Sequence, residues 1–262
     1  MKTFALITGA SQGYGKALAI EFAKNDINVV LVALPNSGVI KLAEYLQNCY
    51  GIKAIDYECD LTLPNSCNDL KYYLNSKGII IKYLVNNAGV LSKDLFEHLS
   101  EDYLEKQIIL NVLVPTKLCK LFLTDLIKTK NGGILNVSSL ASFFHLPKKQ
   151  VYGGTKSYLL SFSKTLGMEL KKYNIKVSTV CPGGMNTTTK ICLQNRKLGI
   201  LGKLSILNPE EAAEITIKNF IKAKRVIIPG KLNKAFLVLN SLIPEALKNF
   251  LIGFNMRKAV VT

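Results

Sequence analysis

Short apolar runs alternate with longer segments of helical period along the chain. Seven runs, each of four to seven residues and rich in β-branched side chains, predict strands at 4–8, 28–33, 53–59, 83–86, 133–138, 176–180 and 225–228. The segments between them predict helices at 15–24, 39–49, 64–76, 101–128, 151–173 and 209–222. Strands that alternate with helices pair in parallel through right-handed crossovers. The pattern therefore predicts an α/β fold, a doubly wound parallel sheet with helices on both faces.

Length and composition indicate the domain organisation. A chain of 262 residues with 48% hydrophobic and 20% charged residues is globular and long enough for one α/β core. No Pro/Gly/Ser-rich linker, low-complexity tract or repeat marks a boundary. We therefore expect a single domain over 1–262, with a substrate lid at 185–205 and a basic, apolar extension at 231–262.

The charge balance points to anionic partners. With 34 basic and 18 acidic residues the net charge is +16, which suits cofactor phosphates, nucleic acid or anionic lipid. The lysines are dispersed and no motif of a nucleic-acid module occurs, so we expect a lysine-rich solvated surface and no nucleic acid. The stretch 236–254 is apolar but too interrupted to span a membrane. A lid or docking helix is favoured there, and peripheral membrane contact stays open as the alternative.

The cysteines and the first residues argue against other classes of protein. Six cysteines are scattered without a C-x-x-C pair and without clustering near the two histidines, so neither a metal site nor disulfides are expected. The apolar run 4–7 is too short for a signal peptide and leads directly into a glycine-rich turn. These features predict a cytoplasmic protein.

The sequence TGASQGYG at 8–15 joins the first strand to the first helix. Gly9 allows a tight turn, Gly13 lets the backbone approach a pyrophosphate, and Gly15 permits close packing of helix on strand. The helix then presents unpaired N–H groups and the positive end of its dipole to the phosphates. A glycine turn that binds nothing is the competing interpretation, but the position after the first strand of a βαβ unit favours phosphate binding.

Two other turns follow predicted strands. Asp60 ends the third strand, where its carboxylate suits hydrogen bonds from an adenine amine or from nearby backbone; a plain helix cap is the alternative. The sequence NNAG at 86–89 ends the fourth strand, and its small residues suit backbone that runs beside a ribose. An ordinary Asn/Gly turn is the competing account.

Candidate catalytic groups lie in the second half of the chain. Tyr152 and Lys156 are four residues apart on a predicted helix and so share a face. We expect the ammonium to lower the tyrosine pKa below its ordinary value of about 10, which would make the phenol a usable proton donor. Ser139 ends the strand 133–138 and flanks the same crevice. Asn111, a poor helix former inside 101–128, is interpreted as holding a water against Lys156 or as an ordinary exposed residue.

The order and spacing of these motifs resemble those of a classical short-chain dehydrogenase/reductase over about residues 3–230. The motifs that carry the resemblance are TGASQGYG, CDLT, NNAG, Asn111, the Ser-Ser step at 138–139, YGGTK and CPGGMNT at 181–187. The resemblance implies a Rossmann fold and NAD(P)(H)-dependent interconversion of a ketone or aldehyde and an alcohol, without a metal. It implies that Tyr152 exchanges the proton, Ser139 orients the substrate oxygen, Lys156 binds the nicotinamide ribose and tunes Tyr152, and Asn111 completes a proton relay through water.

The resemblance also implies a set of cofactor-binding residues, which are Gly9, Ser11, Gln12, Gly13, Tyr14, Gly15, Asp60, Leu61, Asn87, Ala88, Gly89, Tyr152, Lys156, Pro182, Gly183 and Thr187. After the second strand, NAD-preferring members carry an acid, and NADP-preferring members carry a base there or in the glycine turn. The residues at 33–36 and Gln12 provide neither. Because no carboxylate would repel a 2′-phosphate, NADP(H) is favoured over NAD(H).

Several expectations stay open. Gly153 and Gly154 are weak helix formers and predict a loosened start of the catalytic helix. Phe143, Phe144 and Leu146 favour a hydrophobic substrate such as an acyl chain or steroid. The resemblance implies a homodimer or homotetramer through the long helices 101–128 and 151–173. A non-catalytic nucleotide-binding scaffold is the alternative function.

Overall fold

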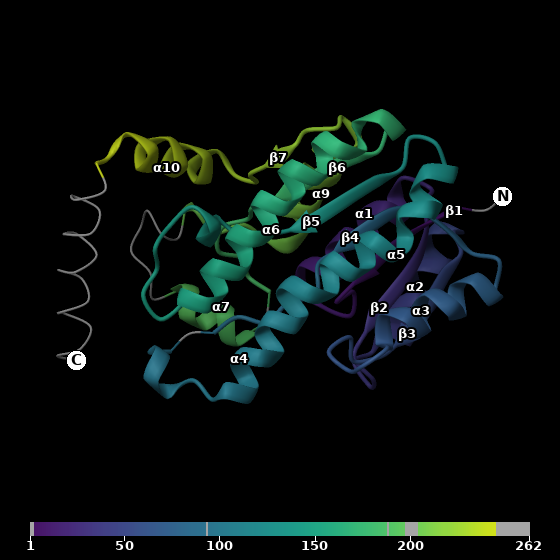
Figure 1. Ribbon diagram of the computed structural model, residues 1–262, viewed down its shortest axis with the longest axis horizontal. Coiled ribbons are helices and arrows are strands. Elements are labelled where there is room, and N and C mark those ends of the chain that lie inside the picture. Colours follow the sequence, from purple (N-terminus) through teal and green to yellow (C-terminus); the bar gives the residue numbers. More distant parts are fainter. Residues whose placement is uncertain (1–2, 93, 188, 197–203, 245–262) are drawn as a thin grey trace.

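The strands form one parallel sheet in the computed structural model, which describes residues 3–92, 94–187, 189–196 and 204–244 (Figure 1). The sheet has seven strands in the order β3-β2-β1-β4-β5-β6-β7, and every neighbouring pair is parallel. Their bounds are β1 Thr3–Thr8, β2 Asn28–Ala33, β3 Ala54–Glu58, β4 Ile80–Asn86, β5 Gly133–Val137, β6 Lys176–Val180 and β7 Val226–Ile227. The predicted doubly wound sheet is confirmed.

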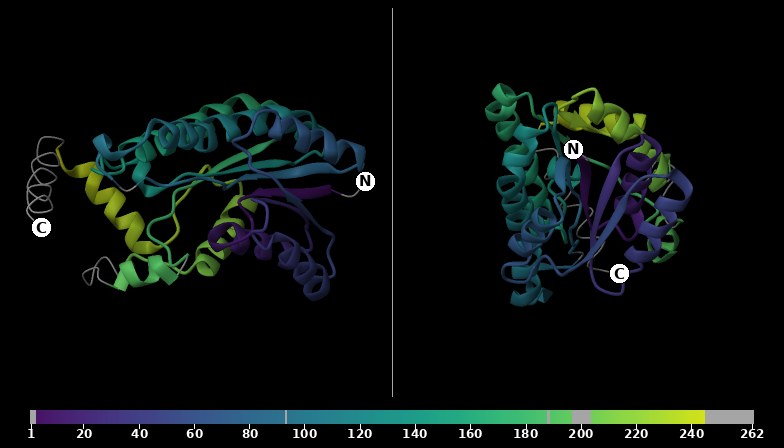
Figure 2. Two further views of the ribbon diagram at one scale, coloured as in Figure 1. Left: turned by 90° about the horizontal axis from the view of Figure 1, so that it is seen from below. Right: turned by 90° about the vertical axis from the view of Figure 1, so that its right-hand side faces the viewer.

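Helices cover both faces of the sheet (Figure 2). One apolar layer packs α1 Gly13–Lys24, α2 Val39–Tyr50 and α9 Pro209–Ile221 against inward side chains such as Ile7 and Leu31. The other packs α3 Ser66–Ser76, α5 Val114–Lys128 and the end of the α6 region against residues such as Leu6 and Val30. Because both faces are buried, the strands are almost continuously apolar instead of alternating.

The order of the strands locates the crevice. After β1 the chain builds outward through β2 and β3, and then crosses back to place β4 on the opposite side of β1. Ligands of open α/β sheets bind beyond the carboxyl ends of the strands at such a reversal. The turns that follow β1 and β4 therefore face each other across the site.

The predicted helix 101–128 is interrupted. It consists of α4 Glu101–Ile108, a π-helical turn η2 at Ile109–Leu113, and α5. Pro115 explains the interruption, because it has no N–H to donate to the carbonyl of Asn111, its α-helical partner four residues earlier. By length and hydropathy this stretch is the one candidate membrane span in the described part of the chain. Its α5 portion packs on β4, as expected of a core helix.

Three further predicted segments lie in the second half of the chain, and the structure describes one of them in full and two in part. The predicted helix 151–173 is α6 Gln150–Glu169 followed by a 3₁₀ turn η4 at Leu170–Tyr173. Within the extension, α10 occupies Lys231–Leu242, and residues 245–262 lie outside the described part. The predicted lid at 185–205 contains α7 Thr189–Arg196. Residues 188 and 197–203 of this lid also lie outside the described part of the chain. Two short 3₁₀ turns, η1 Phe96–His98 and η3 Leu140–Ser142, complete the fold.

Candidate functional site

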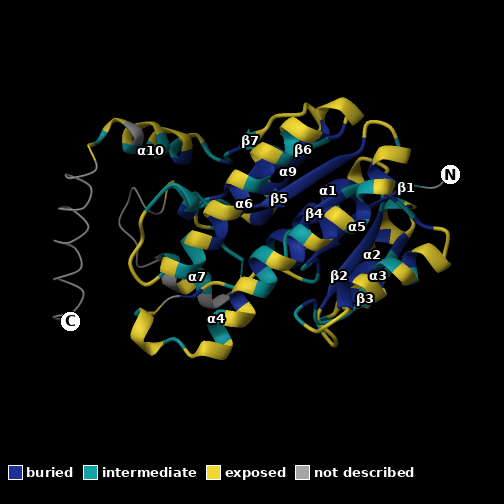
Figure 3. Ribbon diagram, in the orientation of Figure 1, coloured by how far each residue is buried: buried dark blue, intermediate teal, exposed yellow. Residues whose placement is uncertain are grey.

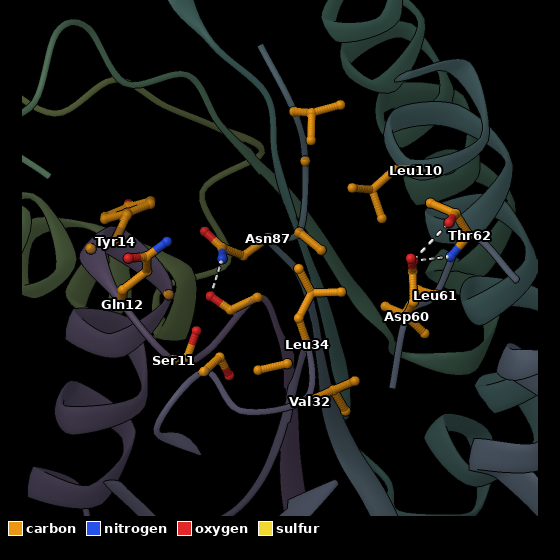
Figure 4. Close-up of a pocket in the computed structure, with 18 of the residues that line it drawn as sticks. Ser11, Gln12, Tyr14, Val32, Leu34, Asp60, Leu61, Thr62, Asn87 and Leu110 are labelled. Atoms are coloured by element: carbon orange, nitrogen blue, oxygen red, sulfur yellow. Dashed lines mark hydrogen bonds between the residues drawn. The ribbon is translucent and has the colours of Figure 1, made fainter. Parts of the chain in front are cut away.

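A cavity of about 750 Å³ opens at the carboxyl ends of β1, β2 and β4 (Figure 4). This volume lies within the usual range for ligand and cofactor sites. Most of the predicted cofactor residues line it, namely Gly9, Ser11, Gln12, Gly13, Tyr14, Gly15, Asp60, Leu61, Asn87, Ala88, Gly89 and Thr187. Tyr152, Lys156, Pro182 and Gly183 are not among its lining residues.

The glycine-rich turn has the conformation that its sequence requires. Gly9 and Gly13 have φ values of +65° and +54°, in the left-handed region that favours glycine. A Cβ at Gly15 would lie only 2.1 Å from the Gly9 carbonyl oxygen, so no side chain fits there. Gln12 precedes α1 and makes no side-chain cap, which leaves the first N–H groups of α1 available to an anion.

Hydrogen bonds connect the turn after β1 to the turn after β4. The Thr8 hydroxyl oxygen accepts from the backbone N–H groups of Asn87 and Ala88, both at 3.0 Å. The Asn87 amide donates to the carbonyl oxygens of Thr8 at 2.9 Å and Gly9 at 3.1 Å. The Asn87 side chain therefore holds the two turns together. Asn87 also lines the cavity.

Asp60 follows β3 and lines the cavity as an ionised carboxylate. Its Oδ1 accepts from the Thr62 N–H at 2.9 Å and from the Thr62 hydroxyl at 2.7 Å (Figure 4). Burial acts to raise the Asp60 pKa, but these hydrogen bonds and the Lys106 ammonium lower it below its ordinary value. The Asp60 carboxylate therefore accepts hydrogen bonds from Thr62 and carries a negative charge.

Tyr14 combines a position in the wall of the cavity with a buried side chain. It lines the cavity, but its phenol lies 2.6 Å from the Thr216 hydroxyl of α9 and is buried in the core. Tyr14 lies within the first turn of α1. The aromatic side chain at this position connects α1 to α9.

Eleven other residues, which were not predicted to bind the cofactor, also line the cavity; they are Val32, Ala33, Leu34, Ser37, Cys59, Thr62, Val90, Tyr103, Lys106, Leu110 and Ile191. The end of β2 was considered only for cofactor choice. Tyr103, Lys106 and Leu110 have the spacing of one helix face. That spacing is the signal in the sequence, but it does not reveal that the face turns toward the crevice.

Two of the predicted catalytic residues, Asn111 and Lys156, lie beside Gly89, which lines the cavity. Lys156 is buried in α6, and its Nζ donates to the Val137 carbonyl oxygen of β5 at 2.8 Å. A Cβ at Gly89, which lines the cavity, would lie 3.0 Å from the Asn111 Oδ1 and 3.3 Å from the Lys156 Nζ. The structure thus brings η2, α6 and the turn after β4 together at this point.

Asn111 is buried at 1% exposure, so the interpretation as an ordinary exposed residue is wrong. Its Oδ1 accepts from the Val90 N–H at 2.9 Å, and its Nδ2 donates to the Val90 carbonyl oxygen at 3.0 Å and the Thr155 hydroxyl at 3.1 Å. The side chain is therefore occupied in fixing the backbone after β4. The predicted water relay through Asn111 stays a prediction.

The tyrosine pKa differs from the prediction. Burial raises the pKa of Tyr152 above its ordinary value, and its hydrogen bond with Ser139 only partly offsets this. The expected lowering by Lys156 is not found, because that ammonium is directed to Val137 and lies 5.7 Å from the centre of the Tyr152 ring. Burial also lowers the pKa of Lys156, to about 8.

The glycine pair in the catalytic motif does not delay the helix. α6 begins at Gln150, upstream of Gly153 and Gly154, so the expectation of a loosened start is wrong. A Cβ at Gly154 would meet nothing within 4 Å, and one at Gly153 would lie 3.5 Å from the Ala141 carbonyl oxygen. Packing of α6 against β6 and η3 compensates for the low helix propensity of glycine.

Within the described residues, no three His, Cys, Asp or Glu side chains are grouped so as to hold a metal ion. The six cysteines are free, and three of them, Cys67, Cys119 and Cys181, are buried. Cys181 lies near Tyr152 and Lys156. Burial raises the pKa of the Cys181 thiol to about 11, so it stays neutral at physiological pH.

Comparison with known proteins gives a consistent result. Residues 3–197 match the family described as short chain dehydrogenase. The 3-oxoacyl-(acyl-carrier-protein) reductase FabG of Aquifex aeolicus is 30% identical over 219 residues, which cover 81% of this chain and 88% of that protein. Mouse 17-beta-hydroxysteroid dehydrogenase type 3 is 29% identical over 198 residues, which cover 75% of this chain and 64% of that protein.

A solved structure agrees with the sequence comparison. The short-chain dehydrogenase from Sphingobium yanoikuyae in complex with NADPH has a TM-score of 0.77 and 28% identity, and the match covers 94% of this chain and 98% of that one. The family match, the FabG relative and this structure agree with the parallel sheet and the glycine turn described above. The chain therefore belongs to the short chain dehydrogenase family, a family of oxidoreductases.

Proposed function

We propose that the protein interconverts a carbonyl and an alcohol with NADP(H), by proton transfer at Tyr152. One observation carries the proposal: a Cβ at Gly89, inside the cavity, would come within 3.3 Å of both the Asn111 and the Lys156 side chains. A dinucleotide in the cavity would therefore extend from the glycine turn to the catalytic group. The left-handed Gly9 and Gly13 and the uncapped start of α1 fit its pyrophosphate.

The chain's own residues supply binding, orientation and the proton. A bound nicotinamide supplies the hydride that is exchanged with the carbonyl carbon. The Tyr152 phenol, neutral because burial raises its pKa, donates its proton to the carbonyl oxygen during reduction. Ser139, which hydrogen-bonds to Tyr152, orients that oxygen. Lys156 is buried, and its Nζ lies 5.7 Å from the centre of the Tyr152 ring.

The preference for NADP(H) is supported by the groups around the end of β2. Ser37 lines the cavity, and its buried hydroxyl oxygen makes no hydrogen bond within the described residues. Lys106 lines the same cavity. The carboxylate of Glu58 accepts a hydrogen bond from the Asn36 N–H at 2.9 Å and does not line the cavity. A 2′-phosphate near Ser37 would meet a hydroxyl that has no other hydrogen-bond partner within the described residues.

The cofactor preference predicts the effect of one charge. In Leu34→Asp, a carboxylate would stand beside the proposed 2′-phosphate, and like-charge repulsion should weaken NADPH binding about tenfold or more relative to NADH. Fluorescence titration of both nucleotides measures the ratio, and Leu34→Asn is the uncharged control. An unchanged ratio in Leu34→Asp would place the 2′-phosphate elsewhere.

The raised pKa of Tyr152 predicts opposite pH profiles for the two directions. Reduction uses the neutral phenol, so its rate should hold from about pH 6 to about pH 8. Oxidation uses the phenolate, whose fraction rises up to about tenfold per pH unit below the pKa, so its rate should increase throughout this range. Initial rates at constant ionic strength test this. A plateau of the oxidation rate near neutral pH would contradict it.

A hydrophobic substrate is supported by the loop after η3 and by the relatives. Phe143 and Phe144 are half-buried and Leu146 is exposed at the carboxyl side of β5. The similar proteins are named for a steroid and for an acyl group. A panel of steroidal, long-chain and small polar ketones tests the proposal. Efficient reduction of the small polar ketones alone would overturn it.

We also propose a homodimer or homotetramer through the outer face of α4, α5 and α6. These helices lie side by side (Figure 1), and their outer surfaces are exposed (Figure 3). Apolar side chains there include Ile108 at 49%, Leu113 at 43% and Met168 at 63% exposure. Large apolar side chains that are exposed on a monomer are typical of subunit contacts when they gather on one face. Sedimentation velocity should show Leu113→Glu as a monomer, whereas Tyr72→Glu on α3 should leave the oligomer intact.

Titration with NADPH and NADH, followed by a ketone panel, tests the proposed function as a whole. Tight NADPH binding with turnover supports a reductase. Binding without turnover of any alcohol or carbonyl would favour the nucleotide-binding scaffold. Binding of neither nucleotide would overturn both functions.

A further inference from the structure

One residue of α10 fills the space beside Gly183. Asn233 is 2% exposed, and its Nδ2 donates to the Pro229 carbonyl oxygen at 2.9 Å. A Cβ at Gly183 would lie 2.8 Å from both the Nδ2 and the Oδ1 of Asn233. The carboxamide therefore packs directly on the Gly183 backbone, and any side chain at 183 would require the Asn233 carboxamide to shift.

The segment around Gly183 is also held by backbone hydrogen bonds. The Cys181 N–H donates to the Ile227 carbonyl oxygen of β7 at 2.8 Å, and the Pro182 carbonyl oxygen accepts from the Leu140 N–H at 2.9 Å. Leu140 directly follows Ser139, so the segment after β6 is connected to the residue proposed to orient the substrate. Asn233 adds a contact from an element outside the sheet.

The same face of α10 reaches the loop after η3. Asn240 donates through its Nδ2 to the Phe143 carbonyl oxygen at 3.3 Å. Asn233, Phe236 and Asn240 share one helix face by their spacing, and this face is buried or half-buried. Val238, on the opposite face, is 59% exposed. α10 therefore contacts both segments that flank the catalytic group.

We propose that Asn233 is a positioning residue for the nicotinamide end of the cofactor. It acts through Gly183 and touches no reacting atom. Its carboxamide sets how far the segment 181–184 can withdraw from the cavity, and so sets where a nicotinamide placed against this segment lies relative to Tyr152. The inference rests on the proposed function, because it assumes that this segment contacts the nicotinamide.

The experiment compares two ligands that share an adenosine half. In Asn233→Ala we expect NADPH binding and kcat to fall about tenfold each, because an error in placement near the reacting atoms is costly. The affinity for 2′,5′-ADP, which lacks the nicotinamide, should change less than about twofold if the adenosine end is untouched. Asn219→Ala is the matched control, because Asn219 also donates to the carbonyl oxygen four residues earlier, at 2.6 Å, but lies on α9.

A double-mutant cycle tests the contact itself. Gly183→Ala should weaken NADPH binding, and Asn233→Ala should partly restore it in the double variant, because the clash is then removed. Asn233→Leu keeps the forked side chain and should bind NADPH more tightly than Asn233→Ala.

The outcomes separate the two proposals. Equal weakening of NADPH and 2′,5′-ADP in Asn233→Ala, or additive effects in the cycle, would overturn the positioning role while leaving the reductase intact. Failure of the unmodified protein to bind either ligand would overturn the proposed function, and with it the positioning role.

Discussion

Tyr152→Phe is expected to lower kcat by about 10²–10⁴-fold in both directions, since it removes the only atom that exchanges the proton in the proposed reaction. NADPH affinity should be retained, because the phenol oxygen is not among the groups that line the cavity. Steady-state rates with a responsive ketone, together with nucleotide fluorescence titration, measure the two effects separately.

The control for this experiment is a tyrosine in the same helix. Tyr158→Phe removes a hydroxyl that lies 2.9 Å from the Thr116 hydroxyl on the exposed side of α6, so it should leave kcat within about twofold. Substantial turnover by Tyr152→Phe would assign the proton transfer to another group. Loss of NADPH binding in that variant would instead show that Tyr152 supports the cofactor.

Gly15→Ala is expected to reduce the free energy of unfolding by about 3 kcal/mol and to abolish cofactor binding. The new Cβ would lie 2.1 Å from the Gly9 carbonyl oxygen and 2.5 Å from the Asn87 Nδ2. Since Gly9 is backbone and Asn87 connects the two turns, relief of the clash must displace the turn that is proposed to hold the pyrophosphate. Urea unfolding and NADPH titration measure the two consequences.

Gly154→Ala is the matched control, because it is also a glycine-to-alanine change inside a helix. Its Cβ would meet nothing within 4 Å, so the higher helix propensity of alanine should stabilise the protein by about 1 kcal/mol. The two variants should therefore differ in sign. If both variants were destabilised by a similar amount, the clash at Gly15 and the open space at Gly154 would not explain their stabilities.

The sequence was informative where a local rule has one physical solution. The strand limits at 28–33 and 176–180 agree with β2 and β6, because long apolar β-branched runs bounded by polar turns fit only buried strands. The sequence also predicted the tight turn at Gly9 and the close packing at Gly15, because a left-handed conformation and a crowded position both require glycine.

Errors arose where the outcome depended on neighbours distant in sequence. The Tyr152 pKa was predicted from Lys156 alone, but burial of the phenol dominates and Val137 of β5 takes the ammonium. Asn111 was interpreted without knowledge of Val90 and Thr155, which bind its amide. Helical spacing gives the face on which a side chain lies, but not the element that faces it.

The sequence by itself determined the parallel sheet and the glycine turn, and it singled out Ser139, Tyr152 and Lys156 as candidates, because periodicity, glycine conformation and family motifs are local properties of the chain. Only the tertiary structure decided which groups share the cavity. It placed Asn111 and Lys156 around Gly89, turned the phenol of Tyr14 into the core, and packed Asn233 of α10 against Gly183. These contacts join residues far apart in the chain, and packing in three dimensions, which no local pattern records, determines them.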